Sequence, residues 1–133
     1  MTYFLDTTVI IDLLRKKIPA VDFITLHMDD AFITSCICEM EIASGIYREE
    51  ESKIEKRRRE VKDLFNSFYQ VLPFNSEQAY IAGQIKAGLA KKGELIDDLD
   101  ILIGAAVLYQ QSVLVTSNIR HFTRIKNLQI HKL

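Results

Sequence analysis

The sequence predicts an α/β fold in which a mainly parallel sheet is flanked by helices on both faces. Short apolar segments of strand length alternate along the chain with longer segments that have a helical period. The helices are long enough to carry the chain back across the sheet, which makes successive strands parallel. The 133 residues, 48% of them hydrophobic, suit one domain with one core, and no linker or repeat interrupts residues 1–133.

The first half of the chain is expected to form two strands, each followed by a helix. TYFL is short and apolar, as in a buried strand, and TTVIIDLLRKK follows it with a helical pattern. AFITS and CICEMEIASGIY repeat this order after an apolar periodic helix that follows Pro19. The predicted elements are a strand at 2–5, helices at 7–17 and 22–28, a strand at 31–35 and a helix at 36–47.

The second half is expected to begin with a long, highly charged helix. The apolar side of that helix carries Ile54, Val61, Leu64, Phe65 and Phe68. Asn75 and Gln78 form a variant of the capping box, which marks the start of the following helix. The predicted elements are a helix at 49–68, a strand at 69–74, the helix opened by Asn75, a helix begun by Asp100, a strand at 112–117 and a final apolar segment at 128–133.

The charge of the chain is nearly balanced, with 17 basic and 18 acidic residues and a net charge of −1. A polyanionic partner must therefore be met by a local patch and not by the field of the whole molecule. Acids and bases alternate in KIEKRRREVK, so a solvated helix face is the default interpretation of this segment. Contact with RNA phosphates or with an acidic partner segment is the open alternative. Candidates for such contacts are Arg57, Arg58, Arg59, Lys62, Lys86, Lys91, Lys92, Arg120 and Arg124.

Two cysteines and the apolar segments bear on the expected location. Cys36 and Cys38 are too close in sequence for an ordinary structural disulfide, and no second pair of ligands completes a zinc site. We expect two buried thiols in a reducing compartment. The N-terminus lacks the pattern of a signal peptide, and the longest apolar run, residues 101–109, is too short to cross a bilayer. A soluble, cytoplasmic protein without membrane contact is therefore expected.

Carboxylates occur where the predicted strands meet their helices. Asp6 interrupts an apolar segment directly after the first strand, where burial costs several kcal/mol, on the order of 2–7, unless the group is paired or bound. Glu41 lies in the helix after the second strand, and Asp100 begins a helix that is otherwise apolar. The fourth strand ends in three polar residues, Thr116, Ser117 and Asn118. Because the carboxyl ends of parallel strands meet at one edge, these groups are expected to share a site.

Such a cluster favours a bound cation. Two carboxylates about 6 Å apart repel by roughly 3 kcal/mol at an effective dielectric constant near 20. Oxygen ligands without a converging histidine or cysteine point to Mg²⁺ or Mn²⁺. The expected chemistry is hydrolysis of a phosphodiester bond by a metal-activated water.

Four segments in order resemble the motifs of PIN-domain proteins, in particular the VapC-type ribonuclease toxins of toxin–antitoxin pairs. These segments are FLDTTVIIDLL, EMEIASG, DLDILIGAA and LVTSNIRHF. The resemblance implies a PIN-like three-layer sandwich and a Mg²⁺- or Mn²⁺-dependent endoribonuclease that cuts RNA, forms a homodimer and is inhibited by a cognate antitoxin.

The resemblance also implies roles for particular residues. Asp6, Glu41 and Asp100 map onto the acidic triad that holds the metal, and Asn118 falls where many members have a fourth acid. These four are the predicted catalytic residues. Thr116 maps onto the polar position that holds the first aspartate. As a departure from the family, Ser117 stands where an asparagine is common.

Other interpretations of the acids remain open. Asp6 and Asp100 could each cap a helix, and Glu41 could pair with Arg48 or face solvent. A haloacid-dehalogenase-like phosphatase would use Asp6 as a nucleophile but would want a second aspartate at Thr8. A non-catalytic PIN-like module that binds RNA or protein is the alternative outside enzymes.

Three further polar residues lie near the proposed site. Asp97 and Asp98 are expected to supply negative charge at a helix N-terminus, with Asp98 as a reserve ligand. His121 is expected to be a surface or phosphate-contacting imidazole, because a metal-activated water does not require a general base.

Overall fold

The computed structural model describes all 133 residues and contains a five-stranded sheet in which every neighbouring pair of strands is parallel. The strand order is β3-β2-β1-β4-β5, so that β1 is central. The strands are β1 (Thr2–Leu5), β2 (Ala31–Ser35), β3 (Gln70–Leu72), β4 (Val113–Thr116) and β5 (Ile130–Lys132). The predicted parallel sheet is therefore confirmed.

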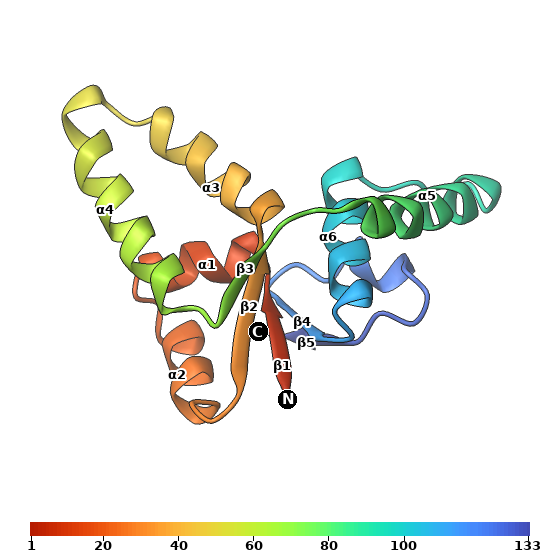
Figure 1. Ribbon diagram of the computed structural model, residues 1–133, viewed down its shortest axis with the longest axis horizontal. Helices are drawn as coiled ribbons and strands as arrows, with labels where there is room; N and C mark the ends of the chain where they lie inside the picture. Colours follow the sequence, from red (N-terminus) through yellow and green to blue (C-terminus); the bar gives the residue numbers. More distant parts are fainter.

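Helices cover both faces of this sheet (Figure 1). One layer contains α1 (Thr7–Leu14), α2 (Ile18–Leu26), α3 (Cys36–Tyr47) and α4 (Glu51–Ser67). The opposite layer contains α5 (Ser76–Lys91), α6 (Asp98–Tyr109) and the short 3₁₀ helix η1 (Phe122–Arg124). The prediction of a sheet between two helical layers is confirmed.

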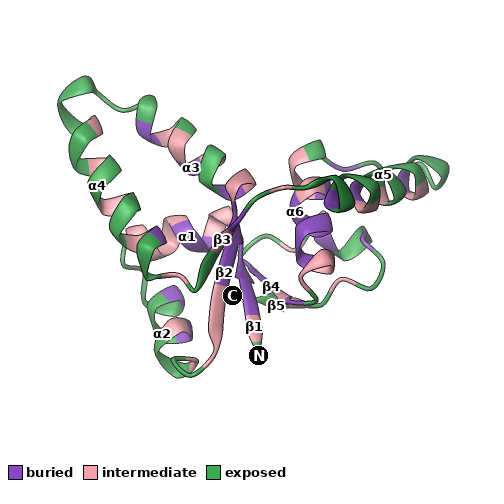
Figure 2. Ribbon diagram, in the orientation of Figure 1, coloured by how far each residue is buried: buried purple, intermediate pink, exposed green.

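The core lies along the central strands and α6, as the buried segments in Figure 2 show. Phe4 of β1 and Leu114 of β4 are fully buried, and Ile103 of α6 is 1% exposed. The apolar run at 101–109 lies inside α6, so its composition serves the core. None of the helices combines the length and the apolar composition that a membrane crossing requires.

The first two helices differ from the prediction at their ends. α1 ends at Leu14 and not at residue 17, because Lys16 has a φ of 55°, a left-handed conformation that a helix cannot include. α2 begins at Ile18, before Pro19, whereas the sequence predicted its start at residue 22. Proline is tolerated in a first turn because the N–H groups there have no partner within the helix.

α3 and α4 pack against each other, with their long axes side by side (Figure 1). The predicted apolar side of α4 is confirmed, since Phe65 is buried and its apolar neighbours are partly buried. On the charged face, Arg57 forms ion pairs with Glu49 (3.7 Å) and Glu60 (3.1 Å). These ion pairs agree with the default interpretation of the basic run as a solvated helix face.

Two details of α5 and α6 bear on the site. The Asn75 side chain accepts a hydrogen bond from the Gln78 N–H (2.9 Å), but the Gln78 side chain donates to the Pro73 carbonyl (3.3 Å), so only half of the capping box forms.

α6 begins at Asp98, which makes Asp100 its third residue and not its first. A Cβ atom on Gly104 would lie 2.5 Å from Ile125 Cδ1, so α6 approaches the segment around η1 closely.

Candidate functional site

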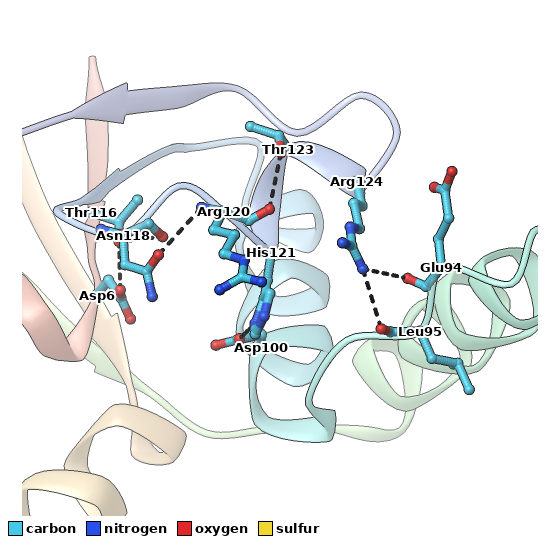
Figure 3. A network of polar contacts seen from close by, with 10 residues as sticks. All are labelled: Asp6, Glu94, Leu95, Asp100, Thr116, Asn118, Arg120, His121, Thr123 and Arg124. Carbon is cyan, nitrogen blue, oxygen red and sulfur yellow. Dashed lines mark hydrogen bonds and ion pairs between the residues drawn. The ribbon is translucent and has the colours of Figure 1, made fainter.

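The candidate site lies at the carboxyl edge of the three central strands. Asp6 follows β1, Ser35 ends β2 and caps α3, and Thr116 ends β4. In Figure 3, Asp6 and Thr116 lie on one side of the site, and Asp100 of α6 lies across from them. The parallel sheet brings these strand ends to one edge, as the sequence predicted.

Asp6 is a buried carboxylate, 4% exposed, that accepts hydrogen bonds from three groups. Its Oδ1 accepts from the Thr7 N–H (2.7 Å), and its Oδ2 accepts from the hydroxyls of Thr8 (3.1 Å) and Thr116 (2.7 Å). Asp6 therefore caps α1, which confirms the capping interpretation, and its carboxylate lies directly after β1.

The charge of Asp6 is disfavoured at this position. Burial raises the pKa of the Asp6 carboxyl above its ordinary value, and the negative charge of Asp100 raises it further. The hydrogen bonds from Thr116, Thr7 and Thr8 oppose this shift in pKa without cancelling it. A cation bound near Asp6 would favour the charged form of the carboxylate and so oppose both causes of the raised pKa.

Glu41 joins the same network through Thr7. The Thr7 hydroxyl donates to Glu41 Oε1 (2.7 Å), while the Thr7 N–H donates to Asp6. Arg48 instead donates from Nε to the Ser44 carbonyl (3.2 Å), so the suggested Glu41–Arg48 pair does not form. One threonine thus orients two of the three predicted acids.

Cys38 lies beneath these groups and is fully buried. Burial raises the pKa of the Cys38 thiol to about 12, and the charges of Asp6 and Glu41 add to the shift. The thiol therefore stays protonated and serves packing. Cys36 is half-buried, and both cysteines are free, which confirms the absence of a disulfide but corrects the expectation that both are buried.

Asp100 does not cap α6 but contacts His121. His121 Nδ1 lies 2.7 Å from Asp100 Oδ2, and both side chains are half-buried. The interpretation of His121 as a surface or phosphate-contacting group is therefore corrected: the imidazole meets a site carboxylate. No periodic pattern or capping motif could reveal this contact, because the two residues come from different elements.

Asp97, and not Asp98, is the additional acid near Asp100. One ligand atom each from Asp97, Asp100 and His121 lies within 4.8 Å of the other two. Asp97 precedes α6 and forms no capping hydrogen bond through its side chain. Asp98 forms an ion pair with Lys86 (3.0 Å), so its expected role as the reserve ligand passes to Asp97.

Asn118 and Ser117 shape the turn after β4. Asn118 Oδ1 accepts from the Arg120 N–H (3.3 Å), and the Asn118 N–H donates to the Thr116 hydroxyl (3.1 Å). The Ser117 N–H donates to the Thr8 hydroxyl (3.1 Å), which ties the turn to α1. The side-chain oxygen of Asn118 is thus engaged with the turn.

The donor set fits a hard divalent cation. Asp6, Glu41 and Asp100 offer carboxylate oxygens, and neither a lysine nor an arginine forms an ion pair with any of them. Their ligand atoms do not all lie within 4.8 Å of one another, whereas those of Asp97, Asp100 and His121 do. Carboxylate oxygens are the ligands that Mg²⁺ and Mn²⁺ accept. Burial, and to a smaller degree the charge of Asp100, raises the pKa of Asp6, and a bound cation would favour the charged carboxylate.

A groove of about 400 Å³ opens beside Glu41 between α1, α3 and α4. Its apolar lining comes from Ile11, Leu14, Ile42, Ile46 and Val61. Charged side chains, including Arg15, Arg48 and Arg57, surround this lining. The groove offers an extended partner a surface that reaches the edge of the site.

Comparison with known proteins identifies relatives of the whole chain. The sequence pattern of the PIN domain matches residues 3–128. Ribonuclease VapC2 of Rickettsia felis is 28% identical over 128 residues, which cover 96% of this chain and 95% of the relative. The tRNA(fMet)-specific endonuclease VapC of Salmonella typhimurium is 34% identical over 95 residues, covering 71% of this chain and 72% of the relative.

Solved structures share the fold. The crystal structure of VapBC2 from Rickettsia felis bound to a DNA fragment from their promoter matches with a TM-score of 0.91 and 21% identity, covering 100% of this chain and 99% of the other. The structure of DNA-bound VapBC from Salmonella typhimurium matches with a TM-score of 0.89 and 26% identity, covering 99% and 98%. The three-layer arrangement is therefore that of these neighbours.

Proposed function

The chain belongs to the PIN-domain family, and from that premise we propose that it is a metal-dependent endoribonuclease, the toxin of a toxin–antitoxin pair. The ribonuclease names of its relatives support RNA as the substrate. The observation that carries the proposal is the buried Asp6 carboxylate, whose charge is opposed by burial and by Asp100 and is matched by no basic side chain in an ion pair. A haloacid-dehalogenase-like function is set aside, because Thr8 donates to Asp6 where that chemistry would want a second aspartate.

Asp6, Glu41 and Asp100 would hold the metal, which we propose to be Mg²⁺ or Mn²⁺. When bound, the cation supplies Lewis-acid stabilisation of the charge that develops on the phosphoryl oxygens and lowers the pKa of water. The chain contributes orientation: Thr7 fixes Glu41 and one oxygen of Asp6, and Thr116 fixes the other oxygen of Asp6. Ligands held in this way need little rearrangement when the cation and the RNA bind.

A cognate antitoxin is the proposed protein partner. Solved neighbours with this fold are VapBC toxin–antitoxin complexes, which supports such a partner for this chain. The groove between α1, α3 and α4 opens beside Glu41, so a segment bound there would cover one side of the site. An apolar segment would match the apolar lining, while Glu41, Glu49 and Glu60 balance the three arginines of the groove. A cytoplasmic location, where RNA is present, goes with this proposal.

A homodimer is also proposed, with α5 as the contact. Tyr80 of α5 is 79% exposed, and it borders a shallow depression lined by Ala79, Gly83, Gln84 and Ala87. α5 extends away from the sheet in Figure 1, and these five residues are all exposed. An aromatic side chain from a second copy would find an apolar surface of small residues there.

The proposed activity is tested by incubating the purified chain with total RNA in Mg²⁺, in Mn²⁺ and in EDTA, and mapping the new RNA ends. Cleavage that requires either metal and yields defined ends is the expected result. Because two relatives are named tRNA(fMet)-specific endonucleases, tRNA(fMet) is the first defined substrate to compare with other RNAs. Cleavage that persists in EDTA would refute the metal dependence, and no cleavage of any RNA with either metal would refute the nuclease and leave the non-catalytic module.

A further inference from the structure

The segment after β4 was expected to supply an oxygen ligand, but the side chain that it brings to Asp100 is His121. Asn118 was predicted as a catalytic residue at the position of the family's fourth acid, but its side-chain oxygen accepts from the Arg120 N–H within the turn. That turn instead brings His121 to Asp100, with Nδ1 2.7 Å from Oδ2 (Figure 3). The side chain that reaches the site from this segment is therefore an imidazole and not an amide or a carboxylate.

The backbone that carries His121 is attached to the site at both ends. On one side, the Thr116 hydroxyl donates to Asp6 (2.7 Å). On the other side, the Arg124 guanidinium donates to the carbonyls of Glu94 (3.3 Å) and Leu95 (3.4 Å), in the loop that leads to Asp97. Phe122 is 2% exposed and anchors the segment in the core. The imidazole position is thus set by contacts on both of its sides.

The side chains around His121 form a mixed set of possible ligands. Ligand atoms of His121, Asp97 and Asp100 lie within 4.8 Å of one another, and Asp97 is not used as a helix cap. Imidazole nitrogen suits transition metals, whereas Mg²⁺ prefers an all-oxygen environment. A nitrogen in this set would therefore shift the balance from Mg²⁺ toward Mn²⁺.

We propose that His121, together with Asp100 and Asp97, ligates the metal of this site and makes it select Mn²⁺ over Mg²⁺. This proposal rests on the metal dependence in the proposed function but not on RNA cleavage. The competing explanation is that His121 only forms an ion pair that neutralises Asp100. The two explanations predict opposite effects on metal affinity when the imidazole is removed. If His121 neutralises Asp100, it competes with the metal and its removal strengthens metal binding. If His121 is a ligand, its removal weakens metal binding.

Metal binding by the EDTA-stripped protein tests the proposal without RNA. Calorimetric titrations with Mn²⁺ and with Mg²⁺ would be compared for the wild type, His121→Ala, His121→Glu and Asn118→Ala. We expect His121→Ala to weaken Mn²⁺ binding by about 10- to 100-fold and to change Mg²⁺ binding much less. His121→Glu, which restores an oxygen ligand, should strengthen Mg²⁺ binding relative to Mn²⁺ binding. Asn118→Ala should change both affinities by a similar factor.

Several results would overturn the proposal. If His121→Ala strengthens the binding of both metals, the imidazole only neutralises Asp100. If the ratio of Mn²⁺ to Mg²⁺ affinity is unchanged in His121→Ala, or falls in Asn118→Ala alone, His121 is not a ligand. These binding measurements stand apart from RNA cleavage, so a protein that binds Mn²⁺ through His121 but cuts no RNA would refute the proposed function and keep this proposal.

A spectroscopic measurement on the wild type tests the proposal even if the variants fail to fold. Electron spin echo envelope modulation of the Mn²⁺-loaded protein should show coupling to a ¹⁴N nucleus. The other two histidines, His27 and His131, pack against Phe23, with ring centroids 4.2 and 4.8 Å from it. His121 is the histidine that contacts a site acid, so its nitrogen is the expected source. Absence of ¹⁴N coupling in the loaded wild type would contradict the proposal.

Discussion

Thr116 links the end of β4 to the buried Asp6 carboxylate, and its hydroxyl is itself fully buried. The hydrogen bond joins a neutral donor to a charged acceptor, a class worth about 1.5–3 kcal/mol. The same hydroxyl accepts from the Asn118 N–H, so it also holds the turn that carries His121. Replacing the Thr116 hydroxyl by a methyl group therefore tests how much this hydrogen bond contributes to stability.

The first prediction is that Thr116→Val lowers the free energy of unfolding by about 1–3 kcal/mol at neutral pH, because it leaves a buried carboxylate with one donor fewer. Urea unfolding in EDTA measures this change. Thr123→Val is the matched control, since Thr123 is exposed and its hydroxyl donates only to the Arg120 carbonyl (3.2 Å). Equal effects of the two substitutions would show that the contact with Asp6 contributes nothing.

The second prediction concerns the pH dependence of stability and rests on the raised pKa of Asp6. A carboxyl whose pKa is higher in the folded than in the unfolded state holds its proton more tightly when folded. Its contribution to stability is therefore present at low pH and is lost as pH rises from the ordinary value through the folded-state pKa. Asp6→Asn, which keeps a capping side chain, should gain stability relative to the wild type across this range.

Urea unfolding of the metal-free proteins at several pH values from about 4 to about 7.5 measures this difference. Asp22→Asn, at an exposed position of α2, is the control and should show no such trend. A wild type that gains stability relative to Asp6→Asn as pH rises would contradict the assigned direction of the pKa shift.

At the scale of elements, α6 and the segment around η1 depend on a close approach. Gly104 faces Ile125, and an added Cβ atom would lie 2.5 Å from Ile125 Cδ1. Ile125 is buried, so its side chain has little room to move. The same segment carries His121, which means that packing between these two elements also positions the contact with Asp100.

The third prediction is that Gly104→Ala and Gly88→Ala have opposite effects. Gly88 lies in α5 with nothing within 4 Å of its added Cβ atom, so alanine there should stabilise by about 0.5–1 kcal/mol through lower backbone entropy of the unfolded chain. Gly104→Ala gains the same entropy but should pay about 1–3 kcal/mol for overpacking against Ile125. Thermal unfolding of both variants compares them, and a stabilised Gly104→Ala would refute the tight contact.

The elements also show which features the sequence could predict. The ends of β1 and β2, the position of Asp6 and the contact of Thr116 with Asp6 follow from local pattern and family motifs, and the structure confirms them. β3 and β4 are shorter than predicted. The contact of His121 with Asp100 joins residues 21 apart in different elements, so no local pattern carries it. The start of α2 before Pro19 was missed because proline is compatible with a first turn as well as with a turn before it.

At the scale of the molecule, the two proposed partner surfaces occupy different parts of the fold. The groove beside Glu41 lies between α1, α3 and α4, whereas the exposed face of α5 belongs to the opposite helical layer. A second copy on α5 and an antitoxin in the groove could therefore bind at the same time. The mass of the free chain in solution reports on the first of these contacts.

The fourth prediction is that the purified chain is a dimer by light scattering and that Tyr80→Glu makes it monomeric at the same concentration. Glutamate would place a charge in the shallow apolar depression on α5. Leu26→Glu, at an 80% exposed position on α2, is the control and should leave the dimer intact. A wild type that is monomeric at all concentrations, or dimers in both variants, would contradict the α5 contact.

The most direct test of the central claim is the rate of RNA cleavage by the wild type, Asp6→Asn and Asp100→Asn in saturating Mn²⁺, with thermal unfolding recorded on the same metal-free samples. Each substitution removes one anionic ligand while keeping nearly the same volume, so we expect cleavage to fall at least about 100-fold. Asp6→Asn should unfold at the same or a higher temperature, because it relieves repulsion at the site. Asp100→Asn alters the contact with His121 but also removes a charge that opposes ionised Asp6, so its stability should change little. If both variants cut RNA at the wild-type rate, or lose cleavage only because they no longer fold, the three acids are structural and the account of a metal-dependent nuclease is wrong.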